Sequence, residues 1–258
     1  MDAVLIRWSE FLGAIRFLTR FPLPVLGEEG PDLGQADLGR TVWAFPLVGA
    51  GLGALSGGVF AFALFWHLPP LGAALLALTT IMLATGALHE DGLADTVDGF
   101  GGGRDRERKL AIMRDSRIGS YGVLALILGV GLRAAALAAL GGFPGDAVLA
   151  LIAAQAASRA FIPLAMQFLE PARADGLGAA MGRPGAPEAA IAAGLGAWIG
   201  LLALGPAGGA AALIGAGGCV LVLLLLARRQ IGGYTGDVLG SVQQIGEIAM
   251  LLAAAAAA

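Results

Sequence analysis

Charged side chains are scarce in this sequence, and their absence is uneven. They make up 14% of the 258 residues, whereas a soluble domain carries about a quarter. Residues 41–89 contain no Asp, Glu, Lys or Arg, and neither do residues 189–227. Soluble helices would need a polar stripe facing water, and these stretches have none. Because about 20 apolar residues cross a bilayer as a helix, the sequence predicts an all-α, polytopic integral membrane protein.

Cysteine content and net charge exclude two further classes. The only cysteine, Cys219, lies in an apolar run, so the chain cannot be a scaffold held by internal disulfides. The formal net charge of −3 is too small to indicate a nucleic-acid partner. We therefore expect the lipid bilayer as a partner and no nucleic acid. The sequence leaves a homo-oligomer open.

Hydrophobic periodicity places helices along the chain. Residues 2–19 gather apolar side chains such as Trp8 and Phe11 on one face, which predicts an amphipathic helix lying in the membrane interface. Pro22 ends this helix, and the acidic, glycine-rich residues 27–39 indicate a loop. Apolar segments predict about six to seven transmembrane helices: residues 42–66, 71–88, 121–140, 146–169, 189–204 and 207–227, then a last helix over residues 238–257.

The basic residues predict which side of the membrane each loop faces. Of the 16 Lys and Arg residues, all but Arg133 and Arg159 lie in the N-terminal segment, in residues 89–120 and 170–188, or at Arg228-Arg229. The short turns that must face the other side have none. The positive-inside rule therefore places the N-terminus and every charged loop in the cytoplasm.

The loop predicted at residues 89–120 opens with closely spaced carboxylates. Asp91, Asp95 and Asp98 follow the spacing i, i+4, i+7, so a continuing helix would place all three on one face. Like charges in that arrangement repel, and a hard cation such as Mg²⁺ would relieve the repulsion by binding carboxylate oxygens. A solvated acidic helix face is the alternative reading.

Glycine and arginine follow the acids. The run Gly101–Gly103 would expose backbone N–H groups, and arginines can grip a phosphate with two N–H groups. Because Mg²⁺ is typically held by one or two carboxylates together with phosphates, the loop predicts a magnesium–diphosphate site. The candidate phosphate ligands are Arg104, Arg106, Arg114 and Arg117.

Two arginines interrupt predicted spans, and a third polar cluster opens the last helix. Charge inside a membrane is costly and usually either functional or paired. Arg159 lies beside Gln155 and could line an entrance to the site or pair with a carboxylate such as Glu247. Asp237 is a further metal or substrate ligand, or a negative charge favoured near a helix N-terminus.

These motifs together resemble a known family. The segments 89–99 (HEDGLADTVDG), 114–119 (RDSRIG), 17–24 (FLTRFPLP), 45–49 (FPLVG) and 235–240 (TGDVLG) are similar, in this order, to the cobalamin synthases, the adenosylcobinamide-GDP ribazoletransferases. The resemblance runs from about residue 11 to residue 252. One departure is Glu90, where the family pattern leads us to expect an apolar residue.

The resemblance implies a Mg²⁺-dependent enzyme of the bacterial inner membrane, forming one catalytic domain over residues 1–258 with its active-site loop at about residues 89–120. A hydroxyl of α-ribazole, or of its 5′-phosphate, would attack the phosphorus of adenosylcobinamide-GDP, and GMP would leave. The roles it implies are as follows: Asp91, Asp95 and Asp98 for the metal, with Glu90 as a further metal ligand, Asp115 and Asp237 for orientation or proton acceptance, and Arg104, Arg106, Arg114 and Arg117 for the GDP phosphates. Arg159 stays a candidate for binding the substrate because of its position inside a predicted span.

Three other functions share part of this pattern. A CDP-alcohol phosphotransferase has Asp where this chain has Leu88, and Ala-Arg where it has Asp95-Thr96. A membrane prenyltransferase carries a second Asp-rich segment, which residues 170–188 lack. A metal transporter would need acids deep within several spans. Release of GMP from a GDP-activated substrate would distinguish a ribazoletransferase from these three alternatives.

Overall fold

The computed structural model describes residues 3–22 and 35–257, and this part of the chain is a bundle of helices without a β-strand. The elements are α1 (Ala3–Leu18), α2 (Gln35–Thr41), η1 (Val42–Ala44), α3 (Phe45–Phe65), α4 (Pro70–Thr85), α5 (Leu88–Gly102), α6 (Arg106–Ile112), α7 (Ser120–Ala139), η2 (Leu140–Gly142), α8 (Pro144–Phe168), α9 (Leu177–Ala180), α10 (Ala186–Leu204), α11 (Pro206–Ile231) and α12 (Gly236–Ala257).

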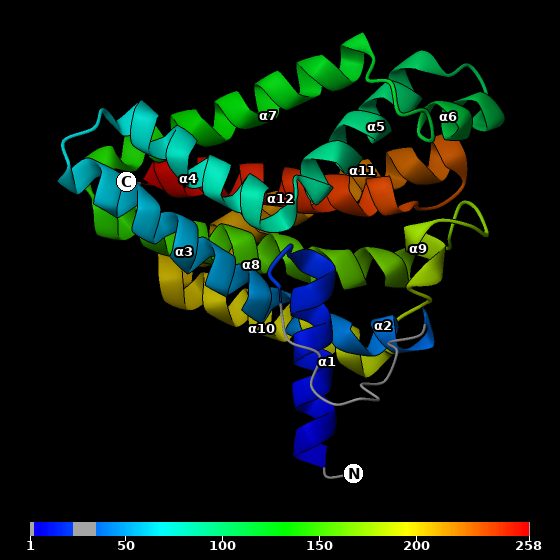
Figure 1. Cartoon of the computed structure of the whole chain (residues 1–258), viewed down its shortest axis with the longest axis horizontal. Coiled ribbons are helices and arrows are strands. Elements are labelled where there is room, and N and C mark those ends of the chain that lie inside the picture. The colour runs from blue at the N-terminus through cyan, green and yellow to red at the C-terminus, as the bar shows by residue number, and fades with distance from the viewer. Residues whose placement is uncertain (1–2, 23–34, 258) are drawn as a thin grey trace.

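Six helical segments in the described part of the chain are long and apolar enough to cross a membrane. They cover residues 38–65, 120–142, 144–168, 186–204, 206–231 and 236–257, and the pair α4–α5 would be a seventh only as a broken span. The prediction of an all-α polytopic bundle with six to seven spans is therefore confirmed. Helix α8 lies at its centre, where it packs against α3, α10 and α12 (Figure 1).

The second predicted span is wrong in its extent. Helix α4 has 16 residues, which at about 1.5 Å per residue is shorter than the roughly 30 Å hydrocarbon core. Gly86 and Ala87 both adopt the left-handed conformation, with φ of 66° and 55°. The chain then turns by 91° into α5. Helix α5 therefore runs at nearly a right angle to α4. Unlike the apolar spans, it is rich in acidic residues.

The N-terminal helix is confirmed, and it runs across the long axis of the spans (Figure 1). Such a direction is the one expected of a helix lying in the membrane interface. Trp8 and Phe11 share a face, with ring centroids 5.7 Å apart. The face packed on the protein includes Glu10, which accepts hydrogen bonds from Trp43 Nε1 and Arg7. Of the loop predicted at residues 27–39, the part from Gln35 belongs to α2, and the rest lies outside the described residues.

Charged segments gather at one end of the molecule. Helices α5, α6 and α9 lie there, whereas the turn between α3 and α4 and the C-terminus lie at the opposite end (Figure 1). This separation follows the distribution of charge along the sequence. It brings segments far apart in the chain, at residues 90–117, 170–183 and 234–237, toward a common polar end.

Glycines allow α3 to pack directly against the backbone of α8. A Cβ atom added to Gly53 would lie 2.5 Å from the carbonyl oxygen of Leu151 and 2.6 Å from Cα of Ile152. Real Cβ atoms do not approach backbone so closely, so alanine at this position would push the two helices apart. Gly51, on another face of α3, has no atom within 4 Å of its added Cβ.

We expect Gly53→Ala to lower the stability of the protein by about 1–3 kcal/mol, the usual effect of overpacking. Thermal unfolding in detergent, followed by fluorescence, measures the change. Gly51→Ala makes the same chemical change in open space, and should leave the midpoint unchanged or slightly raised. Equal midpoints for both variants would show that the α3–α8 contact is not as close as the structure indicates.

Candidate functional site

The predicted acidic face is present, but on a helix rather than in a loop. Asp91, Asp95 and Asp98 lie along α5, and they become progressively less exposed, from Asp91 at the surface to the buried Asp98. The expectation of an open loop over residues 89–120 is wrong, because α5 and α6 occupy much of it. The glycine run is no exposed cradle either, since it ends α5 and Gly103 N donates to a helical carbonyl.

Helices α5 and α12 cross at glycines, and this crossing brings Asp237 to the acidic face. A Cβ added to Gly92 would lie 2.8 Å from the carbonyl oxygen of Asp237 and 3.2 Å from Cα of Gly240. The Ser241 hydroxyl donates to the Gly92 carbonyl oxygen over 3.1 Å and fixes the contact. The two backbones are therefore in direct contact where Asp91 and Asp237 begin their helices.

The carboxylates at this crossing act on one another electrostatically. Partial burial, followed by the charges of Asp91 and Asp237 and a smaller effect of Asp98, raises the pKa of Asp95 to about 7. Arg173 opposes the shift, and its Nη2 lies 3.6 Å from Asp237 Oδ2. Asp91, Asp95 and Asp237 thus form an acidic cluster, defined here by these three residues, that would bind positive charge favourably.

Asp98 is engaged in holding the next span. Its two carboxylate oxygens accept hydrogen bonds from Gly119 N at 2.7 Å and Gly122 N at 2.9 Å. These are amide groups at the beginning of α7 that have no partner within their own helix. Asp98, which the sequence predicted as a metal ligand, therefore caps the N-terminus of α7.

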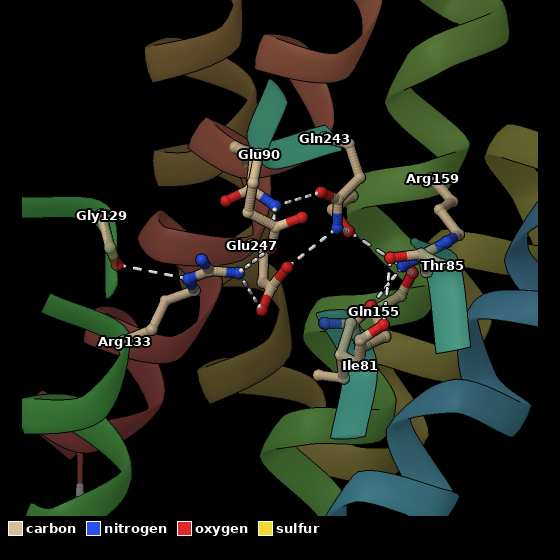
Figure 2. A network of polar contacts seen from close by, with 11 residues as sticks. Ile81, Thr85, Glu90, Gly129, Arg133, Gln155, Arg159, Gln243 and Glu247 are labelled. Carbon is tan, nitrogen blue, oxygen red and sulfur yellow. Dashed lines mark hydrogen bonds and ion pairs between the residues drawn. The ribbon is translucent and has the colours of Figure 1, made fainter. Parts of the chain in front are cut away.

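Glu90 points away from the acidic cluster and into the bundle. Its Oε1 accepts from Arg133 Nη1 and from Gln244 Nε2, both at 3.1 Å. Arg133 Nη1 also lies 3.3 Å from Glu247 Oε1, and Arg133 Nε donates to the carbonyl oxygen of Gly129 (Figure 2). The side chain of Glu90, the acid that departs from the family pattern, thus belongs to a buried ion pair with Arg133 and not to the acidic cluster.

A buried polar network continues from this ion pair across α12 to α8. Gln243 Nε2 donates to Glu247 Oε2 and to the Ser158 hydroxyl. Arg159 is fully buried beyond it, where its Nη1 donates to both oxygens of Gln155 (Figure 2). Glu247 therefore pairs with Arg133. No contact in the described part of the chain joins Arg159 to the acidic cluster.

The first two candidate phosphate arginines differ in what they contact. Arg106 donates from Nε to the carbonyl oxygen of Ile231 and from Nη2 to that of Ala172, at 2.8 and 2.7 Å. It therefore caps the C-terminus of α11 and fixes the segment after α8, so two of the five N–H donors of its guanidinium are already engaged with the protein. Arg104 lies exposed between α5 and α6.

Arg114 and Arg117 form exposed ion pairs with carboxylates. Arg114 Nη2 lies 2.6 Å from Asp175 Oδ1, and such exposed pairs are worth little and exchange readily for another anion. Arg117 pairs with Asp115, and its hydrogen bonds lower the pKa of that carboxyl to about 2. A carboxylate with so low a pKa is a poor proton acceptor, so Asp237 is the better placed of the two predicted bases.

The sequence-based reasoning missed Arg173. Its side chain lies between Asp175 and Asp237, with N–O distances of 3.8 and 3.6 Å, and its Nη1 is buried without a hydrogen-bond partner in the described structure. Together with Arg114, which reaches the same Asp175, it supplies positive charge beside the acidic cluster. The only sequence signal for Arg173 as a site residue was its position in the charged segment after α8.

A metal at this site would need ligands from its substrate. In the described residues no three His, Cys, Asp or Glu side chains lie close enough to hold an ion by themselves. Magnesium is typically bound by one or two carboxylates together with substrate phosphates. The hard oxygen donors of Asp91 and Asp95, whose mutual repulsion a cation would relieve, fit that pattern.

Fold and site together define a multi-pass helical membrane protein with a carboxylate centre flanked by arginines at its polar end. A family model described as cobalamin-5-phosphate synthase matches residues 10–255, so the chain belongs to the cobalamin-5-phosphate synthase family. No solved structure shows significant similarity to it.

Curated relatives agree with this family. A protein of Bradyrhizobium diazoefficiens named adenosylcobinamide-GDP ribazoletransferase is 51% identical over 243 residues, covering 94% of this chain and 92% of the relative. Proteins of the same name from Azorhizobium caulinodans and Rhizobium etli are 50% and 47% identical, and each comparison covers more than nine-tenths of both chains.

Proposed function

We propose that this chain is an adenosylcobinamide-GDP ribazoletransferase. A ribose hydroxyl of α-ribazole, or of its 5′-phosphate, attacks the phosphorus on the cobinamide side of the diphosphate. GMP leaves, and adenosylcobalamin or its 5′-phosphate is formed. The observation that carries the proposal is the acidic cluster with Arg173 beside it, at the polar end of a membrane bundle whose close relatives bear this name.

In this proposal the arginines of the site bind the diphosphate and an aspartate accepts the proton. Arg173 and Arg114 lie where they can neutralise the phosphate oxygens of the diphosphate, since each already pairs with a carboxylate that can be exchanged for phosphate. Asp237, which accepts a hydrogen bond from the Thr235 hydroxyl at 3.1 Å, accepts the proton of the attacking ribose hydroxyl. Such a transfer depends mainly on positioning and charge stabilisation rather than on a covalent intermediate with the protein.

In this proposal Asp91 and Asp95 would bind a magnesium ion. The ion would neutralise negative charge on the diphosphate, which the two carboxylates alone would repel. The crossing of α5 and α12 holds these carboxylates close to Asp237. Asp98 and Glu90 contribute indirectly, because their oxygens are engaged with α7 and Arg133.

We also propose that the protein lies in the bacterial inner membrane with the acidic cluster toward the cytoplasm. The positive-inside rule supports this orientation, because the basic loops gather at the same end as the cluster (Figure 1). GDP-activated substrates are supplied from the cytoplasm, so the site would then face its substrate.

One experiment tests activity and orientation together. Inverted inner-membrane vesicles given Mg²⁺, adenosylcobinamide-GDP and α-ribazole should release GMP, measured by chromatography. Sealed right-side-out vesicles should release none until detergent opens them, because the charged diphosphate cannot cross the bilayer. Vesicles from cells lacking the protein are the control. The proposed activity is refuted if opened vesicles release no GMP, whereas release from sealed right-side-out vesicles would refute only the orientation.

A further inference from the structure

A small cavity opens beside the acidic cluster. It has a volume of about 90 Å³, is partly open, and lies between the end of α1, the beginnings of α5 and α12, and α8 and α9. Asp91 and Asp237 form part of its wall. Leu18, Ile162, Met181 and Leu239, all of them buried, form much of the rest. His89 is the other polar side chain of the wall. The cavity is therefore mostly apolar, with its two acids where it meets the site.

The charge, polarity and size of the cavity exclude most chemical groups of the two substrates from it. In the described structure no Lys or Arg lines the cavity, and its two charged groups are both carboxylates, so a phosphate group would be repelled. Guanine and the amide groups of the cobinamide carry both donors and acceptors that need hydrogen-bond partners when they are buried. The two carboxylates offer acceptors alone, His89 is the one other polar side chain that lines the cavity, and the leucine, isoleucine and methionine side chains offer no partner. The corrin ring system is also far too large for a space of this volume.

We propose that the cavity receives the methyl-bearing edge of the flat, uncharged base of α-ribazole, with the ribose lying at its mouth between Asp91 and Asp237. The inference rests on the proposed function and names the part of the acceptor that this wall recognises. The dimethylbenzimidazole base is the one small, flat, apolar part of either substrate. Its insertion would bring the ribose hydroxyls to Asp237, the carboxylate proposed to accept the proton.

The size of the cavity limits how much of the base enters. An enclosed apolar cavity of about 150 Å³ can hold a benzene molecule. A partly open cavity of about 90 Å³ therefore has room for the edge of the bicycle rather than for both rings. The two methyl groups lie on that edge, so they would contact Ile162 and Leu239, and affinity should depend on their presence.

The test compares two nucleosides in a binding experiment that needs no turnover. Equilibrium binding to the purified full-length protein in detergent is measured for α-ribazole and for the same α-riboside with an unsubstituted benzimidazole. Leu239→Phe and Ile162→Phe each narrow the cavity from a different helix. Leu137→Phe is the matched control, since Leu137 is fully buried in a separate hydrophobic core.

We expect both cavity variants to lower the affinity for α-ribazole relative to the unsubstituted riboside by about tenfold, because one methylene group in an apolar pocket changes binding by roughly 10–200-fold. The control should leave this ratio unchanged even if it destabilises the fold. Two folded cavity variants with the wild-type ratio, or no binding of either riboside to the wild-type protein, would overturn the inference. Failure of the proposed function would appear separately, as wild-type membranes that release no GMP.

Discussion

Asp91→Asn and Asp95→Asn should each lower GMP release by about a hundredfold or more while leaving a folded protein. Asparagine keeps the size of the side chain but removes the charge that would hold a magnesium ion, and losing one preorganised electrostatic contact costs roughly that much. Initial rates at saturating substrate, compared with the yield of monodisperse protein in detergent, measure the effect. Raised Mg²⁺ should partly restore the milder variant by mass action.

The control for these variants is Asp146→Asn, which makes the same change at an exposed acid beginning α8, at the opposite end of the molecule. It should turn over at the wild-type rate. Asp98→Asn should differ from both groups, because it weakens the cap of α7 and so lowers thermal stability as well as activity. Wild-type rates in both Asp91→Asn and Asp95→Asn would leave the acidic cluster as a solvated helix face and refute its role.

Arg133→Leu should destabilise the protein by about 3–5 kcal/mol, the usual result of removing one member of a buried ion pair. The arginine is 1% exposed and contacts both Glu90 and Glu247. Its loss leaves two carboxylates uncompensated inside the bundle. The yield of folded protein and its unfolding midpoint in detergent measure this loss.

A double variant that restores part of the charge balance distinguishes the loss of the ion pair from a simple loss of packing. Adding Glu247→Gln to Arg133→Leu removes one negative charge as well, and should recover part of the stability. Arg228→Leu, at an exposed position of α11, removes the same charge in solvent and should change the midpoint little. If the double variant is no more stable than Arg133→Leu, the buried ion pair is not what holds α5, α7 and α12 together.

Periodicity and spacing predicted much of this fold, because both act within a single helix. The apolar runs gave the spans, and the spacing of Asp91, Asp95 and Asp98 correctly placed three carboxylates on one helical face. The bend after α4 was missed, although Gly86 interrupts an apolar run, since a glycine alone does not show that the next residue also becomes left-handed.

Contacts between distant segments could not be predicted in the same way. Nothing within residues 89–99 shows that Glu90 turns inward to Arg133 while Asp91 faces outward, or that Asp98 binds the amides of the next span. Arg106 was predicted as a phosphate ligand, and its hydrogen bonds to carbonyl groups 66 and 125 residues further along the chain could not be foreseen from its neighbours. Arg173 was overlooked for the converse reason, because its closeness to Asp237 exists only in three dimensions.

The glycine crossing of α5 and α12 has a consequence for motion within the site. No side chain separates the two backbones near Gly92 and Gly240, so rotamer changes of neighbouring residues cannot widen or narrow the gap between the backbones that carry Asp91 and Asp237. The Cα atoms of these two residues can part only if a whole helix slides or tilts against the other, so smaller movements of the carboxylates are limited to rotation of the two aspartate side chains. We therefore expect any opening that admits the large cobinamide substrate to take place in the arginine-bearing segments around the crossing, while the crossing itself keeps the two backbones in place.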